Sequence, residues 1–222
     1  LKPNEHVDEF YVKDIKPFLI VLLKIISSLL VNSYKKTLRV LREVEVKGIR
    51  VVYSLNLYRR KKRRQLDREL RGQGVSVLFV CKGNICRSPF SERLLREISS
   101  RNVRVFSSIA SCGLSYKENN ELDEIGKRSA ELFGVSLCGH RSQNISESLV
   151  SSYDVIIVFE VSHVLAIGSL YPEIRKKTFI LGVMDDEATI DINDPYGGDE
   201  EKYEKVYGRI DRCLRNIFME HA

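Results

Sequence analysis

The sequence predicts an α/β fold, in which a four-stranded parallel sheet carries helices on both faces and follows a mostly helical N-terminal extension. Two observations predict it. From residue 75 onward, short apolar runs alternate with segments of helical length. In addition, the run at 75–80 is apolar except for Ser76 and the run at 153–159 is apolar except for Asp154, as expected for strands that are covered on both faces.

The elements predicted after residue 74 follow one another in strand–helix order. They are a strand at 75–80, a helix at 88–100, a strand at 103–111, a helix around 121–133 that ends at Gly134, a loop with a helix start at 139–146, a strand at 153–159, a helix at 161–170, a strand at 177–182 and a C-terminal helix at 199–219. In such folds ligands bind beyond the carboxyl ends of the strands.

Charge divides the 222 residues into two parts. Residues 1–74 hold 18 Lys and Arg against 8 Asp and Glu, a net charge of +10, whereas the remainder carries −4. Such an asymmetry is typical of two functional parts. Gly72 and Gly74 close the basic part, so we predict the boundary there, with a domain at 75–222. Because no catalytic candidate lies in 1–74, we expect this domain to act without the extension.

The extension contains an apolar segment at 17–31, which includes Lys24. It is shorter than the roughly 20 residues that a spanning helix needs, so we do not expect it to cross a bilayer. Apolar residues recur at helical spacing through 34–46, which predicts an amphipathic continuation. The pattern at 47–58 is compatible with a strand or a helix.

The run RRKKRR at 59–64 is unbroken positive charge. It fits a solvated helix face, a linker, or a surface for an anionic membrane. No nucleic-acid fold signature accompanies it, so nucleic acid is not expected as a partner. Together with the apolar segment it predicts peripheral membrane contact through residues 17–64. The open alternative is that 1–74 are the helical remnant of another domain, because Leu1 is not an initiator methionine.

The cysteines favour a reducing compartment. They are odd in number and contain no metal-type CxxC pair: Cys81, Cys86, Cys112, Cys138 and Cys213. No secretory cleavage pattern is visible. We therefore expect a cytoplasmic protein, peripheral to the membrane if the extension contacts it.

The segment VSVLFVCKGNICRSPFSE, 75–92, predicts an anion site. A strand feeds a helix through a polar loop, and N–H groups in such a loop cradle anions. Ser88 suits the helix N-cap and Pro89 the first helical position. Gly83 eases the curl of the backbone, and Asn84 can tie the loop to itself by side-chain hydrogen bonds.

The loop also holds a thiol and a guanidinium. Its N–H groups, the helix start and Arg87 favour the thiolate of Cys81, the form in which cysteine is a nucleophile. The planar fork of Arg87 matches two phosphoryl oxygens in a way that lysine cannot reproduce. A buried structural thiol is the alternative that we consider less consistent with this context.

The motif CKGNICRSP resembles the signature loop of the low-molecular-weight protein tyrosine phosphatases. Later segments agree in order and distance: SCGL at 111–114, GHRSQNIS at 139–146, YDVIIVFE at 153–160 and DPYGGDEEKYEKVY at 194–207. The resemblance covers about 75–220. It implies the Rossmann-like type I phosphatase fold and the hydrolysis of protein phosphotyrosine through a cysteinyl phosphate, without a cofactor or metal ion.

By this resemblance Cys81 is the nucleophile, Arg87 binds the phosphoryl group, and Asp194 is the general acid and then the general base. The residues implied to bind the substrate are the rest of the loop and one aromatic residue: Lys82, Gly83, Asn84, Ile85, Cys86, Ser88 and Tyr196. The implied partners are a phosphotyrosine protein and a tyrosine kinase.

Some residues depart from the family pattern or stand outside it. Phe159-Glu160 replace a usual Met-Asp, and Cys112-Gly113-Leu114 replace Ala-Gly-Thr; we expect neither change to touch the phosphate loop, but we expect both to alter the support around it. Tyr116 is a weak candidate for the aromatic wall, and His140 is expected to be a structural hydrogen-bonding histidine. We expect four acidic residues to be solvated loop charge: Asp185, Asp186, Glu187 and Asp191.

Three other functions compete with this one. An arsenate reductase of the same fold needs two further cysteines after the loop, and none lies between Cys138 and Cys213. Arginine phosphatases of the family tend to carry Thr where this chain has Ile85. An inert phosphotyrosine-binding module would not need the intact set of Cys81, Arg87 and Asp194.

Overall fold

The computed structural model describes residues 24, 28, 31–48, 56–101, 105–115, 122 and 124–218. Its contacts divide the chain into two compact units, Leu1–Lys47 and Gly48–Ala222. Each unit is described by itself.

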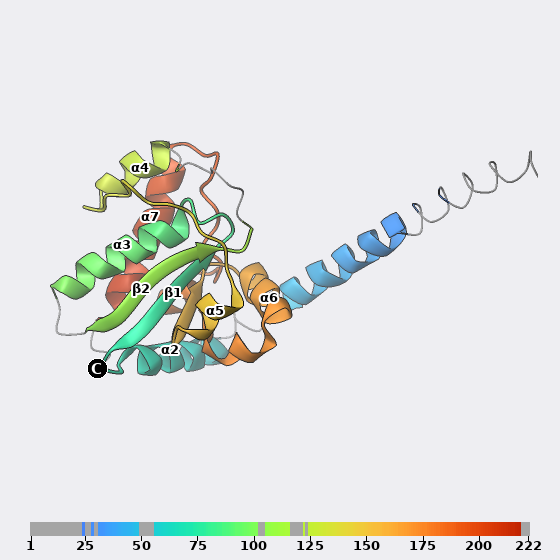
Figure 1. The fold of residues 1–222 in the computed structure, drawn as a ribbon, viewed down its shortest axis with the longest axis horizontal. Coiled ribbons are helices and arrows are strands. Elements are labelled where there is room, and N and C mark those ends of the chain that lie inside the picture. Colours follow the sequence, from blue (N-terminus) through green and yellow to red (C-terminus); the bar gives the residue numbers. More distant parts are fainter. Residues whose placement is uncertain are drawn as a thin grey trace, which may run out of the picture. The chain divides into compact units, whose positions relative to one another are not determined.

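The second unit is built on four parallel strands, as predicted (Figure 1). They are β1 Val75–Cys81, β2 Phe106–Gly113, β3 Val155–Val158 and β4 Thr178–Ile180, in the order β2-β1-β3-β4. Every residue of β1, β3 and β4 is buried, which fits their largely apolar sequences. β1 lies at the centre, so its carboxyl end at Cys81 opens between the ends of β2 and β3.

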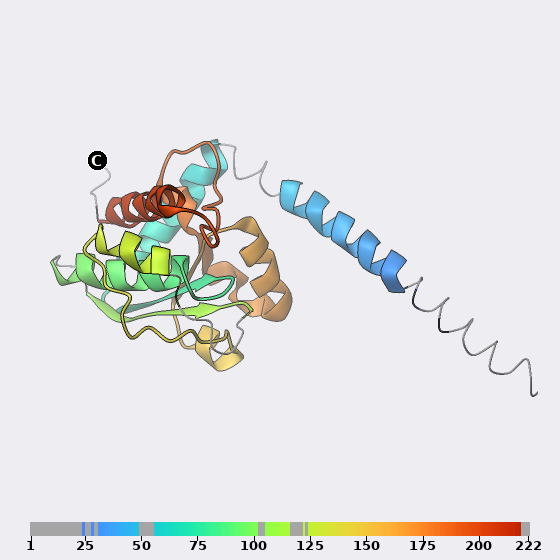
Figure 2. The same cartoon turned by 90° about the horizontal axis from the view of Figure 1, so that it is seen from above.

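Helices cover both faces of the sheet (Figure 2). On one face lie α3 Arg87–Ser100 and α7 Glu200–Asn216, with α4 Glu124–Glu131 packed against α7; α5 Glu147–Ser151 lies on the other face. α6 Val161–Leu170 packs against β4. Two 3₁₀ turns complete the unit, η1 Pro172–Lys177 and η2 Leu181–Met184.

Aromatic packing joins α3 to α7 behind the loop 81–87. The rings of Phe90 and Tyr207 stack with centroids 3.9 Å apart, and Tyr203 meets Tyr207 edge-on at 5.6 Å. Tyr203 and Tyr207 are fully buried. Such rings contribute large buried areas, so this contact fixes the helix that follows the loop.

Several helix ends are set by local capping residues. Ser146 caps α5 by accepting from the N–H of Leu149, and Asp199 caps α7 by accepting from Lys202. Gly134, at φ +71°, ends the turn that follows α4. The strand predicted at 177–182 is shorter than expected, because the chain leaves β4 after Ile180 and tightens into η2.

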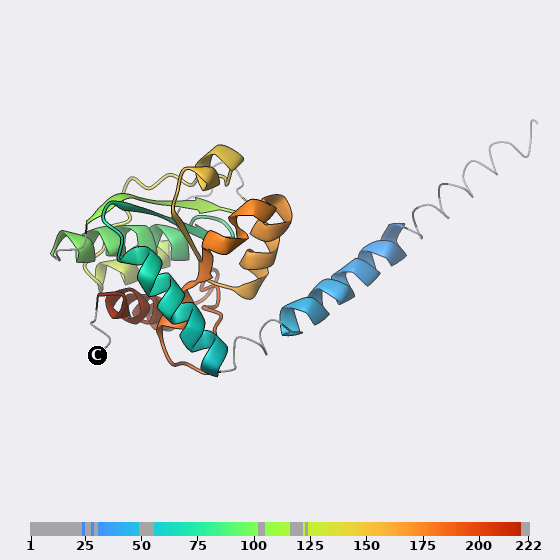
Figure 3. The same cartoon turned by 90° about the horizontal axis from the view of Figure 1, so that it is seen from below.

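The basic run belongs to a helix, α2 Asn56–Leu70, that lies in the same unit as the sheet (Figure 3). The side chains of Leu66 and Leu70 are fully buried, and Arg59 is only 8% exposed. The compact unit therefore begins before the boundary predicted at Gly72 and Gly74, because α2 packs on the α/β layers instead of forming a linker.

Residues 31–48 form one helix, all but the last residue of it in the first unit, in agreement with the predicted amphipathic continuation through 34–46. Its apolar side chains are exposed, among them Tyr34, Leu38 and Leu41. Most of the segment 17–31, and residues 49–55 of the ambiguous stretch, lie outside the described residues. Within the described part, none of the helices combines the length and apolarity that crossing a membrane requires.

Candidate active site

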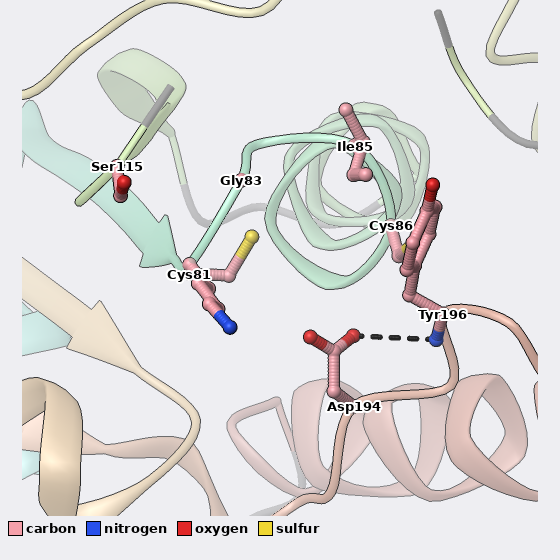
Figure 4. A pocket seen from close by; sticks show the side chains of 8 residues that line it. Cys81, Gly83, Ile85, Cys86, Ser115, Asp194 and Tyr196 are labelled. Atoms are coloured by element: carbon pink, nitrogen blue, oxygen red, sulfur yellow. Dashed lines mark hydrogen bonds between the residues drawn. The ribbon is translucent and has the colours of Figure 1, made fainter. Parts of the chain in front are cut away.

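The loop 81–87 encloses a cavity of about 270 Å³ at the carboxyl end of β1 (Figure 4). The cavity lies where an α/β sheet is expected to bind its ligand. The residues that line it come from the loop, from the end of β2 and from the segment before α7: Cys81, Lys82, Gly83, Ile85, Cys86, Ser115, Asp194 and Tyr196. Figure 4 shows the Asp194 carboxyl group facing the loop, with Tyr196 beside Cys86.

Cys81 has hydrogen-bond donors aimed at its sulfur. The backbone N–H of Asn84 points to Sγ at 3.3 Å, and Ser88 Oγ lies 3.0 Å away. Ser88 Oγ also accepts from the Asn84 side-chain amide at 2.9 Å, and it lies 3.4 Å from the Cys112 carbonyl oxygen, to which it can donate. The Asn84 N–H can therefore donate to the sulfur, and so can the Ser88 hydroxyl when it points to Sγ.

The local geometry of the loop corrects two expectations. The helix begins at Arg87 with Cys86 in the N-cap position and no side-chain cap bond, so the prediction of Ser88 as N-cap is wrong. The Ser88 hydroxyl instead lies within hydrogen-bond distance of the Cys81 sulfur. Pro89 is the third residue of the helix, not the first as predicted. The left-handed residue of the loop is Asn84, at φ 54°. Asparagine tolerates this conformation better than most residues do.

The predicted role of Asn84 in tying the loop together is confirmed, and it extends further. Its amide also donates to Ser111 Oγ on β2 at 2.9 Å, and its Oδ1 accepts from the N–H of Gln143 at 3.0 Å. His140 Nε2 lies 2.9 Å from the Asn84 carbonyl oxygen, as expected for a structural histidine. Burial lowers the pKa of His140, so the ring is neutral and donates through Nε2.

Arg87 is the most buried charge of the site, at 1% exposed. Its Nη1 donates to Glu160 Oε1 at 2.5 Å and to the Ile192 carbonyl at 2.9 Å, and its Nη2 lies 2.9 Å from Asp194 Oδ2. Nε is buried without a hydrogen-bond partner among the described residues. Burial lowers the pKa of Arg87, but Cys81, Asp194 and Glu160 together raise it above its usual value. The guanidinium is therefore a fixed cation.

Glu160 and His163 are site residues that the sequence analysis missed. Glu160 pairs with Arg87, so the expectation that Phe159-Glu160 does not touch the loop is wrong. Burial raises the pKa of Glu160, but hydrogen bonds from Arg87 and Ser162, together with charge from His163 and Arg87, outweigh it and the net shift is downward. Burial and Arg87 lower the pKa of His163 to about 4, although Glu160 lies 3.6 Å from its Nε2. The sequence contained a signal for Glu160, because this residue follows β3, which pairs with β1 in parallel. Glu160 therefore lies at the same edge of the sheet as Cys81.

The second departure also touches the loop, contrary to expectation. The N–H of Leu114 donates to the Cys81 carbonyl and that of Ser115 to the Lys82 carbonyl, both at 2.9 Å. A Cβ on Gly113 would lie 3.0 Å from the backbone N of Asn84, so only glycine lets β2 approach this closely. Tyr116, the candidate aromatic wall, lies outside the described residues.

The other predicted site residues fall into two groups. Lys82, Gly83, Ile85, Cys86 and Tyr196 line the cavity, whereas Asn84 and Ser88 are fully buried beneath it. Cys86 Sγ lies 3.3 Å from the hydroxyl of Tyr203, and burial raises the pKa of Cys86 to about 12, so this second thiol stays protonated.

Asp194 stands at the open side of the cavity. Its side chain is 38% exposed, and its Oδ1 accepts from the N–H of Tyr196 at 3.4 Å. Tyr196 is 60% exposed at the rim. A carboxyl group in this place reaches both solvent and the space above Cys81, as a proton donor to a leaving group must.

The expectation that the neighbouring acidic residues are solvated is wrong for two of them. Asp185 and Asp191 are buried, and only Asp186 and Glu187 are exposed. Burial would raise the pKa of Asp185, but hydrogen bonding and charge from Arg209 lower it overall. The described residues contain no group of three side chains suited to a metal ion.

The comparisons with known proteins agree with this geometry. Residues 76–221 match the model of a family described as low molecular weight phosphotyrosine protein phosphatase. The chain is 35% identical over 138 residues to the low molecular weight protein-tyrosine-phosphatase Etp of Escherichia coli K12, a match that covers 62% of this chain and 88% of Etp.

Two solved structures show the same fold. The tyrosine phosphatase Wzb from Escherichia coli K30, in complex with sulphate, aligns with a TM-score of 0.56 at 35% identity, over 63% of this chain and 93% of Wzb. The YwlE arginine phosphatase from Geobacillus stearothermophilus aligns with a TM-score of 0.56 at 26% identity, over 64% of this chain and 89% of YwlE.

The buried neutral His163 makes a prediction about stability at low pH. The unfolded chain binds a proton at this residue below about pH 6.5, whereas the folded chain does so only near pH 4. Since the unfolded state then binds more protons, the free energy of unfolding falls as the pH drops from 6.5 to 4, by at most about 1.4 kcal/mol per unit. His163→Gln should reduce this fall.

Urea unfolding of both proteins between pH 7 and 4 measures the effect. Asp185 and Glu160, whose pKa values lie below their usual ones, act in a lower window, below about pH 4.5. An unchanged pH slope in His163→Gln would show that the ring takes up its proton in the folded protein.

Proposed function

Because the chain belongs to the low molecular weight phosphotyrosine protein phosphatase family and is a phosphatase, we propose that it hydrolyses protein phosphotyrosine through a phosphocysteine on Cys81. The observation that carries this proposal is the thiol of Cys81 at the floor of the cavity, with Arg87 fixed below and Asp194 facing it. The three groups supply a nucleophile, a phosphoryl-binding cation and a proton donor.

Substrate binding follows from the hydrogen bonds of Arg87. Its Nε is buried and unpartnered among the described residues, and its Nη2 is held by Asp194. A phosphoryl dianion in the cavity accepts from both N–H groups in the bidentate manner that arginine favours. It thereby replaces Asp194, whose carboxyl group is released toward the leaving oxygen. Glu160 keeps Nη1 in place during this exchange.

The first chemical step transfers the phosphoryl group to sulfur. The Cys81 thiolate attacks phosphorus, an S–P bond forms, and the bond from phosphorus to the tyrosyl oxygen breaks. Asp194, which takes up a proton from solvent after it leaves Arg87, gives this proton to that oxygen, so a neutral phenol leaves. The N–H groups of the loop and Arg87 hold the equatorial oxygens, where charge is spread in the transition state.

The second step returns the enzyme to its starting state. The Asp194 carboxylate takes a proton from a water molecule, whose oxygen attacks phosphorus as the P–S bond breaks. Inorganic phosphate leaves, and the thiolate of Cys81 receives the electron pair of that bond. The hydroxyl of Ser88 stabilises the leaving thiolate. No cofactor takes part in these steps.

The rim of the cavity favours an aryl phosphate as substrate. Ile85 and Tyr196 present apolar surface at the mouth, which suits a phenyl ring better than a guanidinium group. The arginine phosphatase function of YwlE is the alternative from the same family. Arsenate reduction lacks its relay cysteines, and an inert binding module would not need the Asp194 carboxyl group at this place.

A phosphotyrosine protein as substrate implies a tyrosine kinase as functional partner. We place the protein in the reducing cytoplasm, because a nucleophilic thiol is preserved there and all five cysteines are free. We keep residues 75–222 as the phosphatase domain and residues 1–74 as an extension, whose helix α2 packs on that domain.

The extension carries a basic surface that fits an anionic membrane. On α2, four exposed cations share one face with the exposed Leu57, and none of them has an ion pair among the described residues: Arg60, Lys61, Arg64 and Arg68. The helix 31–48 adds exposed apolar side chains, such as Leu38 and Leu41. Apolar contact and basic charge together give peripheral binding that either alone does not.

Replacing the nucleophile tests the covalent mechanism. Cys81→Ser should turn over a phosphotyrosine peptide at less than about a hundredth of the wild-type rate, because a serine hydroxyl supplies no anion at neutral pH. Binding of vanadate should persist, since the rest of the cradle is unchanged. The same assay with a phosphoarginine peptide decides the substrate class, and faster hydrolysis of that peptide would overturn the tyrosine assignment.

Replacing the acid tests the role of Asp194. Asp194→Ala should slow aryl phosphates with basic leaving groups by about 10²–10⁴-fold and those with acidic leaving groups far less, because only a basic oxygen needs a proton as it departs. The rates are measured over a series of substituted phenyl phosphates. Equal slowing along the series would remove Asp194 from this role.

Sedimentation with liposomes tests membrane contact. The full chain should sediment with anionic vesicles at low salt, and a variant with Gln at Arg60, Lys61, Arg64 and Arg68 should bind at least about 100-fold more weakly, since each cation contributes about 1 kcal/mol before screening. Neutral vesicles serve as the control. If the full chain remains in the supernatant with anionic vesicles, the membrane proposal is wrong.

A further inference from the structure

The helix α2 precedes the segment that matches the family, which begins at residue 76, yet it contacts the loop that carries Asp194. The contact is made by a buried arginine. Arg59 Nη2 donates to the Gly182 carbonyl at 2.7 Å and to Asp185 Oδ1 at 2.8 Å, and its Nη1 donates to the Glu187 carbonyl. One side chain thus holds three points of the chain between β4 and Asp194.

Two further arginines hold the same loop. Arg63, one turn along α2, donates to the carbonyls of Val183 at 2.8 Å and Asp185 at 2.6 Å. From the opposite side, Arg209 of α7 donates to Asp185 Oδ2 at 2.7 Å and to the Asp191 carbonyl at 2.8 Å. Asp185 therefore lies between an arginine of α2 and an arginine of α7.

The loop then runs directly into the active site. Asp191 Oδ1 accepts from the N–H of Val161, and the N–H of Ile192 donates to the Phe159 carbonyl at 2.8 Å. The carbonyl of Ile192 accepts from Arg87, and Asp194 follows two residues later. Residues 185–199 contain no helix or strand, so side-chain hydrogen bonds of this kind set their conformation.

We propose that Arg59 of α2 is a positioning residue for the general acid. It ties the start of the 182–194 loop to α2, and the loop transmits this constraint to the Asp194 carboxyl group. The inference rests on the proposed role of Asp194. The proposal also revises the expectation that residues 75–222 act without the extension. Deletion of α2 would leave the carbonyls of Gly182 and Glu187 without the donor that Arg59 supplies.

The geometry separates this role from general support of the fold. If Arg59 is lost, Asp185 keeps Arg209 as its ion-pair partner, so no buried charge is left alone. The Cys81 loop makes no hydrogen bond to α2 among those of the described residues. Loss of Arg59 should therefore loosen the 182–194 loop, called the acid loop below because it carries Asp194. Anion binding at Cys81 and Arg87 should remain unchanged.

The experiment compares Arg59→Met with wild type in the full chain, over the series of substituted phenyl phosphates. We expect kcat to fall by about 10–100-fold for basic leaving groups and by less than about 2-fold for acidic ones, as a small misplacement of a catalytic group can cost that much. The dissociation constant for vanadate should not change. Arg59→Lys keeps the charge without the fork and should give an intermediate loss.

Arg71→Met is the matched control, because Arg71 follows α2, pairs with Asp67 of its own helix and does not contact the loop. It should leave every rate unchanged. Thermal melting identifies any variant that fails to fold, and Arg59→Lys then carries the test. Equal slowing along the series, or no slowing in Arg59→Met, overturns the proposal. Failure of Asp194→Ala to show leaving-group dependence overturns the role of Asp194 instead.

Discussion

The structure depends on a buried cation at the centre of the site. Arg87 is almost fully excluded from solvent, and an isolated charge there would be costly. Three groups replace water around it: the carboxylates of Glu160, after β3, and Asp194 pair with its charge, and the Ile192 carbonyl accepts a hydrogen bond. Because these partners come from separate parts of the chain, satisfying one guanidinium brings the sheet edge and the acid loop together. The same pairing leaves the guanidinium oriented toward a phosphoryl group.

Other arginines also join separate parts of the chain by binding several groups at once. Arg59, Arg63 and Arg209 hold an irregular loop by its carbonyl oxygens and by one buried carboxylate, Asp185. A guanidinium presents five N–H donors in a fixed plane, so one residue can order several backbone groups at once. A loop held in this way can place a carboxyl group although it contains no helix or strand of its own.

The sheet and most helices could be predicted from the sequence because their signals are local: continuous apolar runs, an N-cap at Ser146 and a terminating Gly134. The thiol, the guanidinium and Asp194 lie in motifs that are also local. Glu160, His163 and Asp185 were missed or misjudged for a different reason. Their surroundings are made by residues far away in the chain, since Glu160 meets Arg87 across 73 positions and Asp185 meets Arg59 across 126. A carboxylate next to other carboxylates looks solvated until such a partner is known.

The basic run 59–64 is a second case in which the sequence alone does not show which side chains have partners. In the sequence it is uniform charge, but a helix turns 100° per residue and so separates its members. Arg59 and Arg63 face the acid loop, whereas Arg60, Lys61 and Arg64 face outward. The inward pair is satisfied by protein acceptors, and only the outward group is free to attract an anionic surface. A surface can shift catalysis only by binding two states of the enzyme differently. As long as Arg59 keeps α2 docked, contact through the outward face would therefore localise the phosphatase without altering its chemistry.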